Sequence, residues 1–374
     1  MTRKVLICGG YGTFGLRAAE RLGTDPSLQI VLAGRSRTKA DEAVARMQPR
    51  TQARLSALQL DALTPDVAAL RSLAPTVIYN ASGPYQTQDY ALARAAIAIK
   101  SHYLDLADAR AFVAGIHVLD AAARAVGVLV TSGASSVPAL SSAVVDHHLA
   151  DFTVLERLFF GIVPANGFDP GVATTASILS YVGRPFTTLR NGTPQRIHGW
   201  QGIRRHTFPE IGARWLAPCD VPDLAIFPAR YPTLRTIDFT AGLEVPLQFF
   251  GLWGLSWFVR AGLLRKAERL AAPLVKAKSW MNRLGSDAGG MFVEMEGRGA
   301  DGAQKKVSWH LIARQNNGPY VPQTAATALT RKLLAGSQPE RGAMPCVGLL
   351  RLDEITAEMH GLAITTRSQT IHPR

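Results

Sequence analysis

The chain has 374 residues, of which 47% are hydrophobic, and its formal net charge at neutral pH is +13. This length and composition exclude a wholly disordered protein and predict two domains, at roughly 100–200 residues per domain. The positive charge favours an anionic partner such as a phosphorylated cofactor, a carboxylate substrate or an acidic membrane; its largest share, 20 basic against 13 acidic residues, lies in residues 151–330. We expect no nucleic-acid partner, because the arginines are dispersed and no binding-module motif accompanies them.

The three cysteines point to a reducing compartment. Cys8, Cys219 and Cys346 lie far apart, and no two have the spacing of a zinc or redox site. The start Met1–Lys4 leads directly into an apolar run and lacks the longer apolar core and cleavage site of a signal peptide. We therefore expect a cytoplasmic protein with no bound metal.

Short apolar runs alternate with helix-like stretches over residues 1–150, as in a parallel sheet covered by helices on both faces. Six βα units are predicted, with strands at Val5–Cys8, Gln29–Ala33, Leu55–Leu60, Thr76–Asn80, Tyr103–Leu106 and Val128–Thr131. The helices between and after them are predicted at Thr13–Leu22, Thr38–Met47, Pro65–Leu73, Asp89–Ile99, Ala111–Val126 and Ala139–Leu149. The fold class is therefore α/β: a doubly wound parallel sheet of the Rossmann type, with its ligand crevice beyond the carboxyl ends of the strands.

The regular alternation of short strands and helices ends after residue 150. This change predicts a second, α+β domain over residues 151–320 for substrate binding or dimerisation. A long strand is predicted at Leu155–Val163, and a hairpin where Met291–Glu296 and Lys305–Ala313 flank a glycine-rich turn. A further helix is predicted at Gln323–Leu334, within a carboxyl-terminal segment of residues 321–374.

A glycine-rich turn lies between the first predicted strand and the first predicted helix. The residues from Gly10 to Gly15 match the pattern G-x-G-x-x-G, which brings backbone N–H groups and a helix N-terminus against a pyrophosphate. We expect Gly10, Gly12, Thr13, Phe14 and Gly15 to contact a dinucleotide.

The residues after the second strand favour NADP over NAD. An NAD-selective domain would carry an acidic residue there for the ribose hydroxyls, whereas this chain has Arg35, Ser36 and Arg37, which can bind a 2′-phosphate. The alternative is that both arginines are solvated loop residues. Asp61, after the third strand, is expected either to bind the adenine amine or to cap the following turn.

The fourth strand is followed by small residues, which allow a flat nicotinamide ring to approach the backbone. We expect Ala81, Ser82, Gly83 and Pro84 to line the cofactor site. Tyr85 is a candidate proton donor, and its alternative role is to pack in the core or at an interface.

Read together, these segments resemble the saccharopine dehydrogenase-like oxidoreductases. The matching residues are Gly9–Gly15, Ala33–Ser36, Gly83–Tyr85, His102–Leu106 and Gly133–Pro138. The resemblance covers residues 1–150 and, more loosely, the carboxyl-terminal third. It implies a Rossmann domain, a second domain inserted before the chain returns to the first, NAD(P)-linked chemistry and a homodimer. Ser132–Ser135 departs from the Cys-Gly-Phe-Asp-like turn of those relatives.

Catalytic residues are hard to identify, because a nicotinamide cofactor itself supplies the reactive atom. No tyrosine is followed four residues later by lysine, and there is no serine-hydrolase elbow or H-E-x-x-H motif. The weak candidates, besides Tyr85, are Asp105, Asp108 and Ser135, with helix capping as an alternative for Asp108. His102 is expected to be structural. Arg204–His206 could grip a carboxylate, with a solvated charge run as the alternative.

A charge-free run, Val245–Val259, is too short to span a bilayer, for which ~20 apolar residues are needed. Phe250, Trp253, Trp257 and Leu264 are expected near one helical face, followed by basic residues, as in a helix on an anionic membrane. A buried core or dimer helix is the alternative.

The sequence thus predicts an NADP-dependent oxidoreductase of a small carbonyl, imine or amino-acid-like substrate, which could carry a carboxylate. A non-catalytic NADP-binding sensor or scaffold is the main alternative. A membrane-surface-associated oxidoreductase, with peripheral membrane contact, is the third hypothesis.

Overall fold

The computed structural model describes residues 3–167, 171–281 and 284–371. The expectation of no signal peptide rests on Met1–Lys4, and Met1 and Thr2 of that segment lie outside these ranges. The chain divides into two compact units, one of residues 1–143 and 319–359 and the other of residues 144–318 and 360–374.

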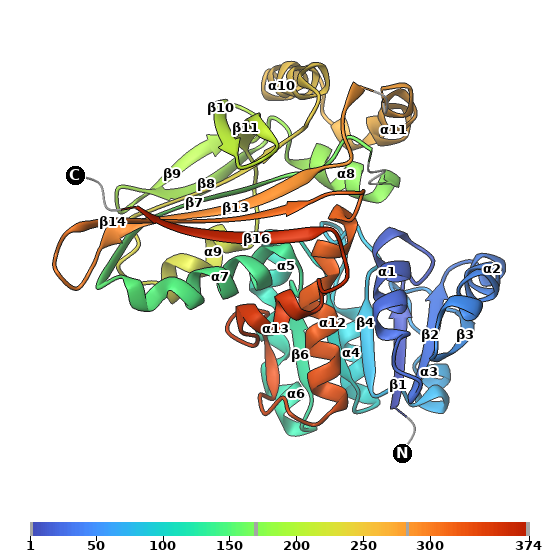
Figure 1. Cartoon of the computed structure of the whole chain (residues 1–374). Coiled ribbons are helices and arrows are strands. Elements are labelled where there is room, and N and C mark those ends of the chain that lie inside the picture. Colours follow the sequence, from blue (N-terminus) through green and yellow to red (C-terminus); the bar gives the residue numbers. More distant parts are fainter. Residues whose placement is uncertain (1–2, 168–170, 282–283, 372–374) are drawn as a thin grey trace. The chain divides into compact units, whose positions relative to one another are not determined.

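Unit 1 is built on a seven-stranded parallel sheet in the order β15-β6-β5-β4-β1-β2-β3 (Figure 1). Its strands are β1 Arg3–Cys8, β2 Leu28–Gly34, β3 Arg54–Gln59, β4 Val77–Asn80, β5 His102–Asp105, β6 Leu129–Ser132 and β15 Gly342–Pro345. Its helices are α1 Thr13–Leu22, α2 Arg37–Met47, η1 Gln48–Arg50, α3 Val67–Leu73, α4 Ala91–Ala98, α5 Arg110–Gly115, η2 Ile116–Leu119, α6 Asp120–Ala125, η3 Ser136–Leu140, α12 Val321–Leu334 and α13 Leu352–Ala357, with η7 Gly318–Tyr320 and α7 Ser141–His148 at its boundaries. This confirms the predicted Rossmann-type sheet, whose strand order reverses between β1 and β4.

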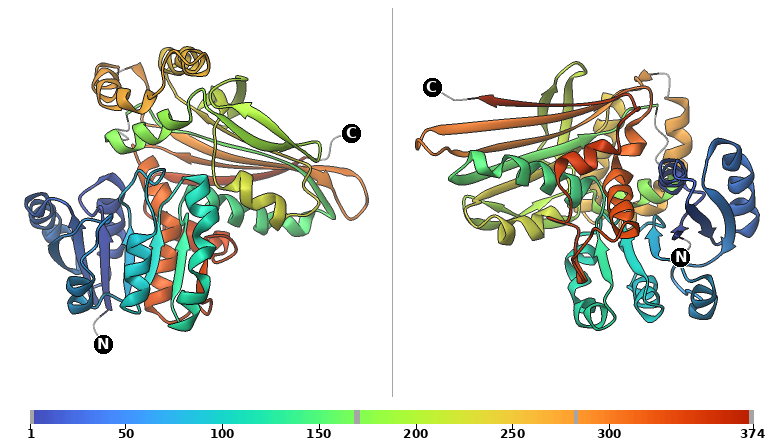
Figure 2. Two further views of the ribbon diagram at one scale, coloured as in Figure 1. Left: turned by 180° about the vertical axis from the view of Figure 1, so that it is seen from behind. Right: turned by 60° about the horizontal axis from the view of Figure 1, so that its bottom comes forward.

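The central strands of unit 1 are buried on both faces, because helices cover each side, whereas the edge strand β3 is partly exposed. Leu6, Ile78 and Tyr103 belong to a core that also contains Leu70 of α3 and Leu92 of α4. The opposite face is covered by α1 and α12, which pack against each other in front of the sheet in Figure 1, whereas Figure 2 shows the sheet from behind. Strands buried in this way read as continuous apolar runs, which is why their positions could be predicted.

The helix predicted at Ala111–Val126 is instead divided into α5, η2 and α6. The Tyr90 hydroxyl donates a hydrogen bond to the Phe112 carbonyl at 2.6 Å, which competes with the bond that a continuous helix would form there. Gly115 follows, and a Cβ atom on it would lie 2.8 Å from the Tyr90 oxygen. The chain therefore tightens into a 3₁₀ turn at Ile116.

Unit 2 contains a seven-stranded mixed sheet in the order β10-β11-β12-β7-β13-β14-β16, and a separate β8–β9 hairpin. The strands are β7 Val154–Val163, β8 Pro185–Arg190, β9 Thr193–His198, β10 Arg204–Phe208, β11 Gly212–Pro218, β12 Thr236–Gly242, β13 Gly289–Arg298, β14 Gln304–Ala313 and β16 Ile364–Ile371. The helices are η4 Leu149–Asp151, α8 Gly171–Tyr181, α9 Asp223–Arg230, α10 Pro246–Arg260, η5 Ala267–Leu270 and α11 Ala271–Trp280. The predicted hairpin is formed by β13 and β14, which pair antiparallel over their whole lengths.

The two faces of β7 differ in chemistry. Phe160 stacks on Phe227 of α9, with ring centroids 6.0 Å apart, so this face is an apolar core. Arg157 and Phe159, on the other face, line a charged pocket. A further core, around Leu179, Trp200 and Phe249, joins α8 to α10 and α11.

Candidate functional site

The turn between β1 and α1 packs against its neighbours at distances that only glycine allows. A Cβ atom on Gly10 would lie 2.8 Å from both the Ile7 carbonyl oxygen and the Leu32 Cα. On Gly15, it would overlap the Gly9 carbonyl oxygen. Since real Cβ atoms do not approach so closely, the glycines of the motif are required by backbone contacts within the turn.

Gly9 is a site residue that the glycine pattern alone did not identify. Its φ is +73°, and a Cβ atom on it would lie 2.7 Å from the Ala81 carbonyl oxygen. The glycine turn therefore touches the end of β4, where the sheet order reverses. The signal in the sequence is the doubled glycine directly after the first strand.

The start of α1 is open to an anion. Gly12 caps this helix and has no side chain that could satisfy its first N–H groups, and the first turn contains no acidic residue. The positive end of the helix dipole and the N–H groups of the first turn, which includes Thr13 and Phe14, suit a pyrophosphate.

The end of β2 presents one arginine without an ion-pair partner among the described residues. Arg35 is exposed, whereas Arg37 pairs with Asp41 at 2.8 Å. The Ser36 hydroxyl accepts a hydrogen bond from the Lys39 amide at 3.3 Å and so caps α2. Of the three residues predicted to bind a 2′-phosphate, Arg35 is the one whose charged group is available.

Tyr11 connects the glycine turn to this strand end. Its hydroxyl accepts a hydrogen bond from the Ser36 amide at 3.1 Å, and its ring lies where a side chain at Gly34 would be. Asp61 accepts a hydrogen bond from the Leu63 amide at 3.0 Å, which is the turn-capping role.

The loop after β4 is organised by Asn80. Its side-chain oxygen accepts hydrogen bonds from the Ser82 amide, at 3.0 Å, and from the Ser82 hydroxyl. Gly83 and Pro84 are exposed and joined by a cis peptide bond. A Cβ atom on Gly83 would meet only the Tyr85 ring, at 3.6 Å, so the space beside Gly83 is open.

Tyr85 has the packing role. Its side chain is buried against Phe112, with ring centroids 5.6 Å apart, and its hydroxyl donates to the Asn80 carbonyl at 2.8 Å. Burial and the nearby Asp105 carboxylate raise the pKa of Tyr85 well above its ordinary value. These contacts make Tyr85 a poor proton donor at neutral pH.

Asp105 joins the ends of β5 and β6. It is fully buried, and its Oδ1 accepts hydrogen bonds from the Ser132 hydroxyl at 2.8 Å, the Gly133 amide at 2.9 Å and the Ala107 amide at 3.0 Å. Burial raises the pKa of Asp105 to about 6, although these hydrogen bonds lower it. The carboxyl group therefore positions the Gly133–Pro138 turn.

The remaining candidates differ in accessibility. Asp108 is half-buried and accepts a hydrogen bond from the Gln86 amide group at 3.2 Å; the next helix is capped by Ala109, without a side-chain bond. Ser135 is buried in the turn.

His102 accepts a hydrogen bond from the Leu129 amide at 2.9 Å, and burial lowers the pKa of His102 to about 4. His102 thus holds β6 beside β5, in a structural role.

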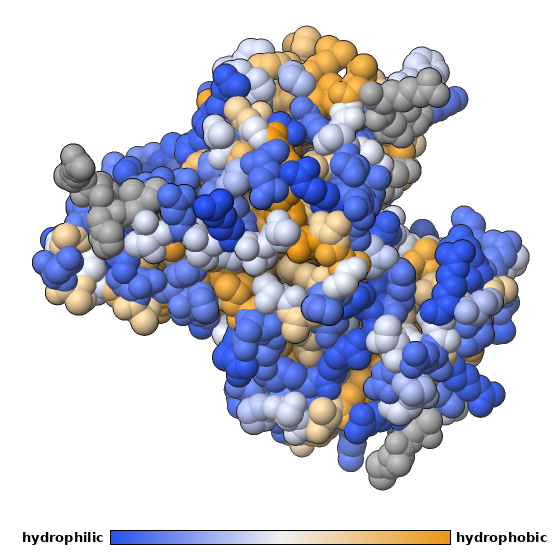
Figure 3. Space-filling view, viewed as in Figure 1, coloured by the Kyte–Doolittle hydropathy of each residue, from blue (hydrophilic) through white to orange (hydrophobic). Residues whose placement is uncertain are grey.

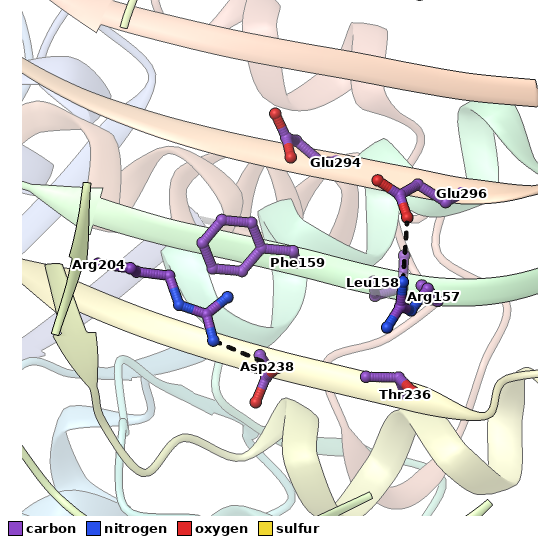
Figure 4. Close-up of a pocket in the computed structure, with 8 residues that line it drawn as sticks. All are labelled: Arg157, Leu158, Phe159, Arg204, Thr236, Asp238, Glu294 and Glu296. Carbon is purple, nitrogen blue, oxygen red and sulfur yellow. Dashed lines mark ion pairs between the residues drawn. The ribbon is translucent and has the colours of Figure 1, made fainter. Parts of the chain in front are cut away.

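The pocket of unit 2 carries charges of both signs and has a volume of about 190 Å³ (Figure 4). Arg204 lies 3.7 Å from Asp238, and Arg157 lies 3.8 Å from Glu296. Glu294, between them in Figure 4, pairs with Lys306 at 2.9 Å. The paired charges suit a ligand that carries both a carboxylate and an ammonium group.

Arg204–His206 is a solvated charge run only in part, because Arg205 is exposed whereas Arg204 lines the pocket and His206 is buried. The Arg204 guanidinium lies 4.6 Å from the Phe159 ring centroid, and that of Arg205 lies 5.2 Å from the Trp215 ring. His206 is buried and stacks on Phe292 at 3.7 Å. Because alternate residues of a strand point to opposite faces, only Arg204 of the two arginines lines the pocket.

Comparison with known proteins identifies the first unit. Residues 5–148 match the family model described as the saccharopine dehydrogenase NADP binding domain. These residues form a saccharopine dehydrogenase-like NADP-binding domain. The matched domain is of the NADP-binding type.

The whole chain has the fold of a solved saccharopine dehydrogenase. Apo saccharopine dehydrogenase (L-Glu forming) from Saccharomyces cerevisiae matches with a TM-score of 0.68 and 13% identity, over 98% of this chain and 100% of that one. A short-chain dehydrogenase from Sphingobium yanoikuyae in complex with NADPH (21% identity, TM-score 0.23) covers only 28% of this chain and 52% of its own. No curated protein matches in sequence.

We expect Tyr85→Phe to lower the free energy of unfolding by about 1 kcal/mol, because the hydrogen bond to the Asn80 carbonyl is lost. The NADPH affinity should not change. Denaturant unfolding and fluorescence titration measure the two effects, and unchanged stability with a large loss of turnover would instead identify Tyr85 as a proton donor.

Asp105→Asn should change the pH dependence of stability. The pKa of Asp105 in the folded protein, about 6, exceeds the ordinary 3.8, so the folded state binds more protons than the unfolded chain between these values. The free energy of unfolding of the parent should therefore fall, relative to that of the Asn variant, as pH rises from about 4 to about 6. Parallel pH profiles in urea unfolding would contradict this.

Gly83→Val should weaken NADPH binding while the domain stays folded, because the added methyl groups enter the open space beside the cofactor loop. Gly83→Ala is the matched control and should have a smaller effect. Calorimetric titration and circular dichroism test this, and unchanged affinity in the Val variant would place the nicotinamide elsewhere.

Proposed function

We propose that this protein is an NADP-dependent reductase or dehydrogenase of a small, polar carbonyl, imine or amino-acid-like compound. The observation that carries the NADP preference is Arg35 at the end of β2, which is exposed and has no ion-pair partner among the described residues, at a position where an acidic residue is absent. The charged substrate is inferred from the pocket of unit 2, where Arg157 and Arg204 form long ion pairs of 3.8 and 3.7 Å that they can exchange for a ligand's carboxylate.

The proposed division of roles within unit 1 follows from the geometry. Gly10 and Gly15 allow the close backbone packing that forms the turn, the uncapped start of α1 after Gly12 faces the pyrophosphate, and Arg35 binds the 2′-phosphate. NADPH supplies a hydride, so the protein has to bind and orient the reactants. Asp105 is fully buried, whereas Asp108, three residues later, is half-buried. We therefore assign the handling of a substrate proton to Asp108, the more accessible of the two acids.

A non-catalytic NADP-binding sensor or scaffold is the second proposal, and it is favoured by the departure from the family pattern at Ser132–Ser135. Substrate-dependent loss of NADPH absorbance distinguishes the two proposals. The compounds to test are small carbonyl compounds, alone and mixed with amino acids, chosen by mass spectrometry of molecules that co-purify with the protein. No change with any of them would favour the sensor.

A location and an assembly are also proposed. Cys8, Cys219 and Cys346 are buried and form no disulfide bond within the described residues, which suits a reducing compartment such as the cytoplasm. A homodimer is proposed from the family resemblance, with sedimentation analysis as its test.

Arg35→Ala should weaken NADPH binding by roughly ten- to a hundredfold and leave NADH binding nearly unchanged. Charge-assisted hydrogen bonds contribute roughly 1.5–3 kcal/mol, and each 1.4 kcal/mol is a tenfold change in affinity. Arg37→Ala is the matched control: Arg37 already pairs with Asp41, so its loss should have little effect.

Calorimetric titration of both cofactors against the parent and both variants measures these affinities. Equal NADH and NADPH affinities in the parent would overturn the assignment. Loss of NADPH preference only in Arg37→Ala would assign binding of the 2′-phosphate to Arg37 instead of Arg35.

A further inference from the structure

Helix α10 turns an apolar face outward. Phe249, Ser256 and Val259 are buried against unit 2, whereas Leu247 is 69% exposed and Phe258 is 56% exposed. The exposed apolar residues are three, four or seven positions apart and share one side of the helix: Leu247, Phe250, Gly251, Trp257 and Phe258. An ordinary surface helix exposes its polar side, so this arrangement requires a partner that accepts apolar side chains.

Further large apolar side chains are exposed after α10 in the chain. Leu263 is 76% exposed, Trp280 at the end of α11 is 83% exposed and Leu284 is 64% exposed. Among the described residues, 8 of the 13 exposed large hydrophobic residues lie between Leu247 and Leu284. Figure 3 shows the apolar surface over α10, and Figures 1 and 2 show α10 and α11 at the same end of unit 2. We call this surface the α10–α11 surface.

The structure corrects the expected face in two respects. The helix ends at Arg260, and Leu264, beyond it, packs partly buried against the core of unit 2, so the exposed residue is Leu263. Trp253 is half-buried. A helix buried in the core of this chain is excluded by the exposure of Trp257 and Phe258.

Basic side chains border the α10–α11 surface. Residues 245–281 contain six basic residues and one acidic residue, Glu268. Arg265, Lys266 and Arg269 are exposed, and they form no ion pair within the described residues. The Arg260 guanidinium lies 5.4 Å from the Trp257 ring centroid, so charge and exposed aromatic surface adjoin.

We propose that the α10–α11 surface docks onto an anionic lipid surface, with α10 lying parallel to it. Trp and Phe side chains enter the headgroup boundary, and the basic residues meet lipid phosphates. The 15 residues of α10 extend about 22 Å, short of the ~30 Å hydrocarbon core, so the helix lies on the bilayer. No helix in the described part of the chain is long and apolar enough to cross a membrane.

A second copy of the chain is the less suitable occupant. A two-fold interface would bring the same surface of both copies together, and therefore the same excess of positive charge. Like charges opposed across an interface weaken association. An anionic bilayer attracts these residues instead, and binding should fall as salt is raised.

The test is flotation of the full-length protein with phosphatidylglycerol vesicles and with phosphatidylcholine vesicles. We expect binding to phosphatidylglycerol at low salt, and little binding to phosphatidylcholine. Trp257→Ser combined with Phe258→Ser should reduce the bound fraction at least tenfold, as should Arg265→Glu, Lys266→Glu and Arg269→Glu together. All these residues are exposed, so circular dichroism and NADPH affinity should stay those of the parent.

Two control variants separate the surface from general properties of the chain. Leu63→Ser with Val118→Ser removes hydrophobic residues that are 51% and 63% exposed in unit 1. Arg46→Glu, Arg50→Glu and Arg54→Glu together make the same change in net charge, also in unit 1. Neither should reduce flotation.

Three outcomes would overturn the proposal. The first is absence of binding to phosphatidylglycerol at low salt. The second is an equal loss in the control variants. The third is a dimer, in sedimentation analysis, that Trp257→Ser with Phe258→Ser dissociates while vesicle binding stays unchanged, because the surface would then be occupied by a second copy.

Discussion

The close backbone contacts of the glycine turn are the constraint on which the nucleotide site depends. Gly10 lies against β2, Gly15 lies against Gly9, and Gly9 in turn lies against Ala81 after β4. Three loops that are distant in the sequence are thereby held together where the strand order of the sheet reverses. The same contacts direct the uncapped start of α1 to one place, so an anion bound there lies within reach of both neighbouring strand ends.

Buried polar side chains hold the adjoining strand ends in position. Asn80 accepts a hydrogen bond from the Ser82 amide in the loop after β4. Asp105 accepts hydrogen bonds from the Ser132 hydroxyl and the Gly133 amide at the end of β6. A buried carboxyl group with a raised pKa can indicate a catalytic acid. At Asp105 burial is the largest cause of the shift, and three hydrogen bonds engage one oxygen, which together describe a positioning residue.

Unit 2 contains two surfaces of contrasting chemistry. The charged pocket pairs each of its three carboxylates with an arginine or lysine, whereas α10 exposes aromatic side chains near basic residues that form no ion pair within the described part of the chain. Charge separates their proposed partners: a ligand with both signs of charge for the pocket, and a negatively charged surface for α10. In the proposed function, unit 1 binds the cofactor, which performs the chemistry, and the pocket of unit 2 binds the charged ligand.

The sequence by itself determined six of the seven strands of the unit 1 sheet, the glycine turn and the absence of an acid near Arg35; the seventh strand, β15, was not predicted. These features are local: strands buried on both faces read as apolar runs, and the G-x-G-x-x-G spacing reflects contacts within one turn. Only the tertiary structure decided that Tyr85 packs, that Asp105 holds Gly133, that Arg204 joins Asp238 and that α10 is exposed. Those roles depend on residues far apart in the chain, and helical periodicity defines a face without indicating which face meets the core.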